Sequence, residues 1–457
     1  MAQAGSSTPT RPQPTRLYRW MVLIFVSLAM FGNYYVYDCI APVADLLTAQ
    51  LHFSDSNIGL LQAIYSIPNV FMVLIGGLVV DRIGTRKSIL IFGVLCFLGA
   101  IITVLSPLLP VMAAGRLVFG LGAESLIVAV TTAVAKWFRG KELSFAFGIN
   151  LMIARFGSLL AQWSPSWARF AYTFWRTPLL ISVVFGALCV VGALIYWVLE
   201  VHAEKRYEIG QAGATEKVVF SDVKTFGVSY WFIVALCIVF YSAIFPFETF
   251  AYKFFMDVHH TTREASGDLV GMLTIFTMFG TPLFGLFVDK IGKRALLMML
   301  GSVLLIPVYL TMAYAHSARS LTLYLPAFTG GHITLLPHEL PLVLLLTMAM
   351  MGVAFSLIPA VMWPSVAYIV EQRKLGTAYG LMTMIQNIGL AGFNLLIGWA
   401  NDHSQATATN PGGYSLGMWI FSILGFLGVL FAYLLRRRET GPHGHGLETI
   451  TTKSATA

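Results

Sequence analysis

The sequence has little charge and few cysteines. Asp, Glu, Lys and Arg make up only 11% of its 457 residues, whereas a soluble domain carries about 25%. This deficit excludes a soluble globular enzyme, a disordered scaffold and a nucleic-acid-binding protein. The four cysteines lie inside apolar runs, so they predict neither a disulfide framework nor a metal site, and we expect no cofactor.

Apolar residues, which make up 57% of the chain, gather in long segments. A helix that crosses the hydrocarbon core needs about 20 mainly apolar residues. Twelve segments meet this requirement: 19–47, 56–80, 88–107, 109–136, 142–168, 176–200, 228–255, 266–288, 294–314, 340–366, 374–400 and 413–436. The first is too long for the apolar core of a signal peptide, and no cleavage pattern follows it. We therefore predict an all-α integral membrane protein with twelve transmembrane helices and no strands.

Basic residues are distributed unevenly between the two sides of these segments. Of the 29 Lys and Arg residues, 22 fall in loops and tails on one side and five on the other. Because cytoplasmic loops carry an excess of Lys and Arg, we expect both termini in the cytoplasm. The net charge of +8 then reflects those loops rather than an anionic partner.

The two halves of the chain repeat. Residues 77–87 read GLVVDRIGTRK, and residues 285–295 read GLFVDKIGKRA. Six-plus-six parallel repeats are typical of transporters. The predicted organisation is a flexible cytoplasmic tail (1–18), a six-helix bundle (19–200), a cytoplasmic linker (201–227), a second six-helix bundle (228–436) and another flexible tail (437–457).

The duplicated loop resembles the signature of the major facilitator superfamily. Several segments, in order along most of the chain, also resemble the lysosomal dipeptide transporter family, major facilitator superfamily domain-containing protein 1. They include YDCIAPVA at 37–44, GRLVFGLGAESLIVA at 115–129, WFRGKELSFAFGINLMIARFGS at 137–158 and WPSVAYIVEQRKLGTAYGLMTMIQNIGLA at 363–391. The resemblance implies the twelve-helix major facilitator fold and transport of dipeptides.

The sequence departs from that family in three places. The tail MAQAGSSTPTRPQPTR contains no acidic dileucine sorting signal, the long external loop 315–340 is additional, and Glu248 replaces an apolar residue. We therefore expect a bacterial relative in the inner (cell) membrane.

Glu124 and Arg155 are the two strongest candidates for a binding site. Each lies near the middle of its apolar segment, about 20 Å from the ends at 1.5 Å per residue, and charges at that depth are usually functional. The resemblance implies that they hold the amine and the carboxylate of a peptide. Arg suits a carboxylate because its planar fork binds both oxygens. The alternative is that Glu124 and Arg155 pair with each other and join their helices.

Three further charges lie within apolar segments. Asp38, next to Tyr37, has two interpretations. It lines the binding site or its gate, or it is a charge that is paired where helices pack together. Arg116 is interpreted as mainly structural. Glu248 is either a proton site or an outward-facing charge near the external end of its helix.

Uncharged side chains complete the candidate site. Asn387, the repeat counterpart of Arg155, and its neighbour Gln386 lie in the middle of segment 374–400. We expect the pair Trp363–Pro364 to break its helix. The aromatic residues that could form side-chain pockets, or alternatively only pack, are Tyr34, Tyr37, Phe245 and Trp363.

The duplicated loops are candidate gates. Their acidic and basic residues should cap and pair the cytoplasmic helix ends, holding an outward-open state. These residues are Asp81, Arg82, Arg86, Asp289, Lys290 and Arg294.

These observations predict a transporter that works by alternating access and is not an enzyme. The expected substrates are dipeptides or similar small zwitterions. An ionised Glu124 can hold a peptide amine without a proton, which favours uniport. The alternative is a proton-coupled organic-anion (carboxylate) symporter or antiporter, with Arg155 as the anion site and Glu124 as the proton site. We expect a monomer in contact with membrane lipid, with an accessory subunit left open and no nucleic-acid partner.

Overall fold

The computed structural model describes residues 12–138, 142–208, 220–315, 319–326, 332–442 and 444–451. Twelve of its helical segments are long and apolar enough to cross a membrane, which confirms the prediction of twelve transmembrane helices. The middle of the expected linker, 209–219, and the first eleven residues lie outside the described parts.

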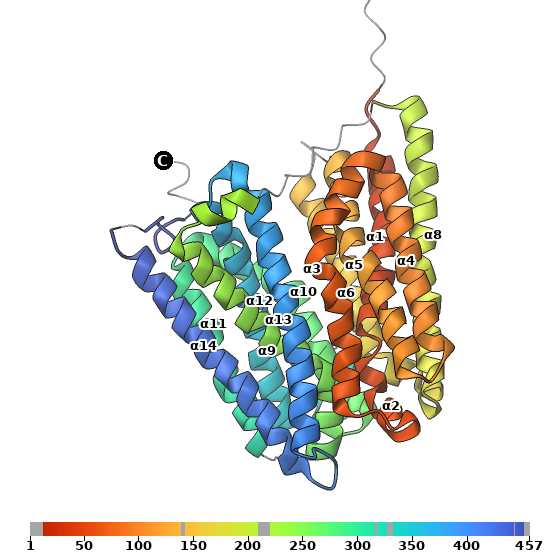
Figure 1. Ribbon diagram of the computed structural model, residues 1–457, viewed down its shortest axis with the longest axis vertical. Coiled ribbons are helices and arrows are strands. Elements are labelled where there is room, and N and C mark those ends of the chain that lie inside the picture. Colours follow the sequence, from red (N-terminus) through yellow and green to blue (C-terminus); the bar gives the residue numbers. More distant parts are fainter. Residues whose placement is uncertain are drawn as a thin grey trace, which may run out of the picture.

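The helices form two bundles that lie side by side (Figure 1). The first bundle contains α1 Arg16–Asp38, η1 Ala41–Val43, α2 Ala44–Leu51, α3 Asp55–Ile83, α4 Thr85–Leu105, α5 Leu109–Phe138, α6 Leu143–Gln162, α7 Ser164–Trp167, η2 Arg169–Thr173 and α8 Arg176–Arg206. The second contains η3 Phe220–Thr225, α9 Val228–His259, α10 Arg263–Ile291, α11 Arg294–Tyr314, β1 Ser320–Pro326, β2 His332–Pro341, α12 Leu342–Ile369, η4 Gln372–Lys374, α13 Leu375–His403, η5 Pro411–Tyr414 and α14 Ser415–Glu439.

Two faces of the molecule are used below. The start of α1 and the end of α14 both lie at the upper end of Figure 1, which we call the terminal face. The opposite face carries α2 and the turn between α13 and α14. The bundles diverge toward the terminal face in this view and approach each other toward the opposite face.

The first transmembrane segment is not one continuous helix. It ends at Asp38 and resumes at Ala44 as α2. Pro42 explains the break, because it has no N–H to donate to the carbonyl of Asp38 four residues earlier. Asp38 therefore lies at the end of α1.

The expected break at Trp363–Pro364 is wrong. Helix α12 continues from Leu342 to Ile369 through Pro359 and Pro364. Transmembrane helices tolerate proline where neighbouring groups satisfy the freed backbone atoms. Nearby, the hydroxyl of Tyr379 on α13 donates to the carbonyl of Trp363 at 3.1 Å.

The prediction of no strands is also wrong. The long loop on the opposite face contains an antiparallel hairpin, with β1 and β2 paired from Ser320–Pro341 to Pro326–His332. The hairpin is attached to α10 by His338, whose Nδ1 lies 2.8 Å from the carboxylate of Asp268. An antiparallel hairpin is compatible with this position because it lies beyond the membrane-spanning helices.

The C-terminal tail is folded over part of its length, contrary to expectation. Residues 437–439 belong to α14, and segment 444–451 returns to the second bundle. Glu448 Oε1 accepts from the backbone N–H groups of Ala295 at 2.8 Å and Leu296 at 3.2 Å. These bonds satisfy free N–H groups at the start of α11, which is favourable there. The side chain of Leu447 is fully buried.

Close helix contacts in the first bundle depend on glycine. A Cβ added to Gly157 on α6 would lie 2.2 Å from the carbonyl oxygen of Phe31 on α1. A Cβ on Gly148, in the same helix, would meet nothing within 4 Å. Helix α6 therefore packs on α1 through one glycine and presents the other away from it.

We predict that Gly157→Ala destabilises the protein, whereas Gly148→Ala does not. Overpacking against a backbone atom should lower the free energy of unfolding by about 1–3 kcal/mol. Thermal unfolding in detergent, followed by tryptophan fluorescence, would measure the difference between the two variants. Equal unfolding temperatures would show that the α1–α6 contact has room for a methyl group at Gly157.

Candidate functional site

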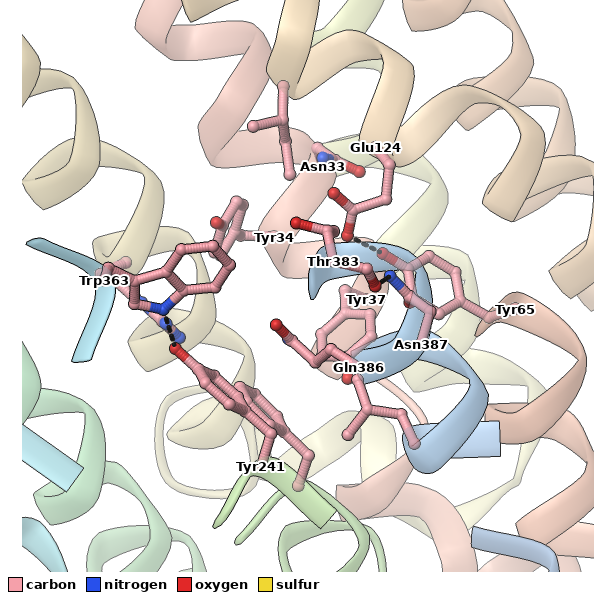
Figure 2. Close-up of a pocket in the computed structure, with 14 residues that line it drawn as sticks. Asn33, Tyr34, Tyr37, Tyr65, Glu124, Tyr241, Trp363, Thr383, Gln386 and Asn387 are labelled. Carbon is pink, nitrogen blue, oxygen red and sulfur yellow. Dashed lines mark hydrogen bonds between the residues drawn. The ribbon is translucent and has the colours of Figure 1, made fainter. Parts of the chain in front are cut away.

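A cavity of about 290 Å³ receives side chains from both bundles (Figure 2). Helices α1, α3, α5 and α6 contribute from the first bundle, and α9, α12 and α13 from the second. The residues that line it are Asn33, Tyr34, Tyr37, Tyr65, Glu124, Ile127, Arg155, Tyr241, Phe245, Trp363, Thr383, Gln386, Asn387 and Leu390.

The structure brings most of the predicted binding residues into this one cavity. Those that line it are Tyr34, Tyr37, Glu124, Arg155, Phe245, Trp363, Gln386 and Asn387. Asp38 does not line it, although the adjacent Tyr37 does.

Sequence reasoning missed six lining residues. Five of them lie one or two helical turns from a predicted residue, so helical spacing could have identified them: Asn33, Ile127, Tyr241, Thr383 and Leu390. Tyr65 had no such signal, because no candidate had been placed on α3.

Glu124 and Arg155 line the same cavity without forming an ion pair. No contact within 4.0 Å between them is found, although both side chains are described. Glu124 Oε1 accepts from the hydroxyl of Tyr65 at 3.5 Å. The guanidinium carbon of Arg155 lies 5.5 Å from the ring centre of Tyr34 and 5.9 Å from that of Phe355. The alternative in which the two charges pair and join their helices is therefore wrong for this state.

Glu248 is not the outward-facing charge that was one of its two interpretations. Its side chain on α9 is buried, with 9% exposure, and it interacts electrostatically with Asp38 and Arg155. A carboxylate is costly to bury inside a membrane-spanning helix, so a charge at this position is a candidate for a functional role. The possibility of a proton site at Glu248 stays a prediction.

Arg116 has the structural role that the sequence indicated. Its side chain is only 1% exposed and donates to the backbone carbonyls of Val36 at 2.9 Å, Tyr37 at 3.3 Å and Leu61 at 3.3 Å. The first two carbonyls lie in the last turn of α1, where a cation is favourable. Arg116 thus holds the end of α1, and with it Tyr37, against α3 and α5.

The second bundle presents an aromatic wall to the cavity. The rings of Tyr241 and Phe245 are stacked at 5.7 Å with an interplanar angle of 4°. Phe355 meets the Phe245 ring edge-on at 5.6 Å. Trp363 donates its indole N–H to the hydroxyl of Tyr241 at 2.9 Å (Figure 2). The charges Glu124 and Arg155 therefore come from the first bundle alone. Both bundles supply aromatic lining residues: Tyr34, Tyr37 and Tyr65 from the first, and Tyr241, Phe245 and Trp363 from the second.

Helix α13 adds amide side chains to this wall. Asn387 Nδ2 donates to the carbonyl of Thr383 at 3.1 Å, and Gln386 Oε1 lies 3.7 Å from the thiol of Cys237. Each amide is therefore anchored at one atom while the residue lines the cavity. The wall combines apolar area with a few placed polar groups, as is typical of small-molecule sites.

A cluster of polar residues joins the bundles at the opposite face. The start of α3 meets the end of α13, where Asp402 accepts from the N–H groups of Asp55 at 2.9 Å and Ser56 at 2.8 Å. The carboxylate of Asp55 forms an ion pair with Lys253 of α9 and accepts from Asn401 Nδ2 at 2.9 Å. Asp55 and Lys253 are both buried. We call these five residues the opposite-face lock.

Further contacts at the same face surround the lock. Gln162 at the end of α6 accepts from the Tyr252 hydroxyl through its carbonyl at 2.6 Å and from Thr274 through its side chain at 2.6 Å. Asp45 pairs with Arg263. Helices of the two bundles are thus closed against each other at this face.

The predicted gating residues lie at the terminal face. Arg86 pairs with Glu204 at 2.7 Å, and Asp289 pairs with Arg294 at 2.9 Å. Each of these pairs joins helices of a single bundle. Asp81, Arg82 and Lys290 lie at exposed or partly exposed helix ends, and their gating role stays a prediction.

A family model described as "Major Facilitator Superfamily" matches residues 26–334. The protein belongs to this superfamily. The transporter is 30% identical to the "Lysosomal dipeptide transporter MFSD1" of Homo sapiens over 96% of this chain and 91% of that protein. It is 32% identical to the protein of the same name from Danio rerio, over 84% and 80% of the two chains.

Three other proteins are similar to the transporter. It is 30% identical to the "Galacturonate transporter" of Dickeya chrysanthemi, but over only 39% of this chain and 50% of that protein. Among solved structures, a bacterial homolog of the human lysosomal transporter Spinster, described as inward-facing and unoccupied, matches with a TM-score of 0.68 at 17% identity, covering 93% and 98% of the chains. The nucleoside transporter NupG matches with a TM-score of 0.67 at 16% identity, covering 92% and 99%.

These findings confirm the predicted fold class and family. The protein is a multi-pass integral membrane transporter of a small molecule and not an enzyme. The resemblance to the dipeptide transporters, which the sequence motifs indicated, is also confirmed over most of the chain.

We predict that Lys253→Met opens the opposite face of the transporter. Removing Lys253 leaves the buried Asp55 carboxylate without its partner, which costs about 3–5 kcal/mol. This cost destabilises the state in which the lock is closed and so favours the state in which it is open. Spin labels at Ala49→Cys on α2 and Ala408→Cys on the α13–α14 turn, both at exposed positions, would report longer distances.

The matched control is Arg169→Ala. Arg169 also joins the bundles, through Glu264 at 3.1 Å, but its side chain is 83% exposed, so this pair is worth about 0–1 kcal/mol. Its label distances should stay close to those of the parent protein. The lock is refuted if Lys253→Met leaves the distances unchanged.

Proposed function

We propose that the transporter moves dipeptides or similar small zwitterions across the membrane by alternating access, as a uniporter. The observation that carries this proposal is that Glu124 and Arg155 line one cavity without pairing with each other. One anionic and one cationic group are then both available to a ligand.

The chemistry of a dipeptide matches this pair of charges. Its ammonium and carboxylate lie roughly 5–7 Å apart, given the reach of two residues. Arg155 suits the carboxylate as a bidentate donor, and Glu124 suits the ammonium as an acceptor. A cavity of about 290 Å³ is of the size that holds a small molecule.

The relatives support the same substrate class. The proteins that match most of this chain at about 30% identity are named as lysosomal dipeptide transporters. We infer that Glu124 and Arg155 serve the two peptide ends here.

Alternating access gives the opposite-face lock its role. The excess of Lys and Arg favours a cytoplasmic terminal face, and the closed lock then corresponds to an inward-facing state. Breaking the lock and closing the duplicated loops around Asp81 and Asp289 would produce the outward-open state. We place the protein in a bacterial cell membrane, as a monomer.

A second candidate is a proton-coupled carrier of organic anions. Arg155 would bind the anion, and Glu124 would carry the proton. The galacturonate transporter gives this candidate limited support, because the similarity spans 39% of the chain.

We predict that the two charges can be assigned by pairing protein variants with modified ligands. Arg155→Lys keeps the charge but loses the fork, so dipeptide affinity should fall by about 1.5–3 kcal/mol. Arg155→Ala should no longer distinguish a dipeptide from its C-terminal amide, and Glu124→Gln should no longer distinguish it from its N-acetyl form. Calorimetry on the purified parent protein and each variant, with each of the three ligands, gives these affinities.

Each variant serves as the control for the other. Arg155→Ala should keep its preference for a free amine, and Glu124→Gln its preference for a free carboxylate. Normal dipeptide binding by Arg155→Ala would contradict the proposal. If Arg155→Ala instead abolishes binding of a uronate that the parent protein takes, the anion carrier is the better description.

We predict that dipeptide uptake does not move protons. An ionised Glu124 holds the ammonium directly, so no proton needs to accompany the substrate. The fluorescence of a pH-sensitive dye inside liposomes, which reports the internal pH, should stay constant during uptake of a neutral dipeptide. Acidification that follows uptake and disappears in Glu124→Gln or Glu248→Gln would overturn the uniport mechanism.

A further inference from the structure

The hydroxyl of Tyr241 has a hydrogen for which the described residues provide no acceptor. Tyr241 lies on the cavity wall (Figure 2), and its oxygen accepts from the indole N–H of Trp363 at 2.9 Å. A phenolic hydroxyl can accept and donate at once. The indole nitrogen can only donate, so the Tyr241 hydroxyl cannot give its own hydrogen to Trp363. Because Tyr241 lies on the cavity wall, this hydrogen is available to a ligand in the cavity.

Neighbouring rings hold this donor in place. The Tyr241 ring is stacked on Phe245 at 5.7 Å and meets Phe355 edge-on at 6.3 Å. The Trp363 ring is stacked on Tyr379 at 6.0 Å, and the hydroxyl of Tyr379 donates to the Trp363 carbonyl at 3.1 Å. The indole and the phenol therefore have little freedom to separate, and the donor is preorganised.

We propose that Tyr241 donates a hydrogen bond to the carbonyl oxygen of the substrate's peptide bond, and that Trp363 is the positioning residue that aims this donor. This inference rests on the proposed function, since it requires that the cavity takes a dipeptide. It goes beyond that proposal by assigning the recognition of the peptide bond itself.

The assignment follows from the polar groups of a dipeptide. Apart from its side chains, a dipeptide offers an ammonium, a carboxylate and one amide. The first bundle supplies Glu124 and Arg155 for the two charged ends. The remaining acceptor is the amide carbonyl, and Tyr241 meets the cavity from the other bundle. A free amino acid has no such carbonyl, so this contact would favour dipeptides over amino acids.

The direct test replaces the peptide carbonyl rather than only the protein side chain. In a thioxo-dipeptide the C=O of the peptide bond becomes C=S, which is a poorer hydrogen-bond acceptor of similar shape. We expect the parent protein to bind thioxo-alanylalanine about three- to tenfold more weakly than alanylalanine, the worth of one neutral hydrogen bond. Tyr241→Phe should bind the two ligands equally, and Trp363→Phe should reduce the difference.

Tyr309→Phe is the matched control. It also removes a buried hydroxyl from the second bundle, but that hydroxyl donates to the carbonyl of Ala243 at 2.7 Å and lies outside the cavity lining. Its thioxo discrimination should equal that of the parent protein. The preferences for a free amine and a free carboxylate should remain in Tyr241→Phe, which a merely unfolded or distorted site would not show.

Three results would overturn the inference. One is equal affinity of the parent protein for the two ligands, which needs no variant and holds even if Tyr241→Phe does not fold. Another is unchanged thioxo discrimination in Tyr241→Phe. The last is the absence of any dipeptide binding by the parent protein, which would reject the proposed function and this inference together.

Discussion

Charge inside a bilayer is costly, at about 2.5–3.5 kcal/mol for a residue at the centre of a helix, and this constraint accounts for where the transporter keeps its few intramembrane charges. Arg116 is satisfied by carbonyls at the end of α1. Lys253 is paired with Asp55. Arg155 and Glu124 instead face a cavity, where water or a substrate can satisfy them. These intramembrane charges therefore separate into Arg116, Lys253 and Asp55, which hold the structure, and Arg155 and Glu124, which are available to a ligand.

The same helices carry both the cavity wall and the opposite-face lock. Helix α9 holds Tyr241 at the cavity and Lys253 at the lock, about 18 Å further along at 1.5 Å per residue. Helix α13 holds Asn387 and Asp402, and α3 holds Tyr65 and Asp55. Because packed helices move as rigid elements, a ligand that changes how these helices meet at the cavity also changes how they meet at the lock. This continuity gives a physical basis for alternating access.

Much of the fold was predictable because membrane helices leave a strong signal. Length and apolarity predicted twelve crossings, and the repeated loop at 77–87 and 285–295 indicated two halves. Depth along each segment was enough to select Glu124 and Arg155, since helical rise is constant. The exceptions involve details that hydropathy does not report, such as the end of α1 at Asp38 and the continuity of α12 through Pro364.

Contacts between distant segments could not be predicted from the chain. Asp55 is 198 residues from Lys253 and 347 residues from Asp402 in the sequence, and no local pattern shows that they meet. Glu248 was judged from its distance to the helix end, but its side chain is buried, which depends on how the helices pack together. The hairpin and the folded tail were missed because both are short segments outside the long apolar runs, and each is held by contacts with a distant helix, α10 for the hairpin and α11 for the tail.

The central claim is that this cavity carries dipeptides through the membrane, and counterflow tests it most directly. Purified protein in liposomes preloaded with one unlabelled solute would be supplied with a trace of labelled dipeptide outside. The account predicts transient accumulation of the label when the liposomes contain dipeptides, and none when they contain single amino acids or a uronate. Accumulation of a labelled uronate against internal uronate, with no response to dipeptides, would contradict it.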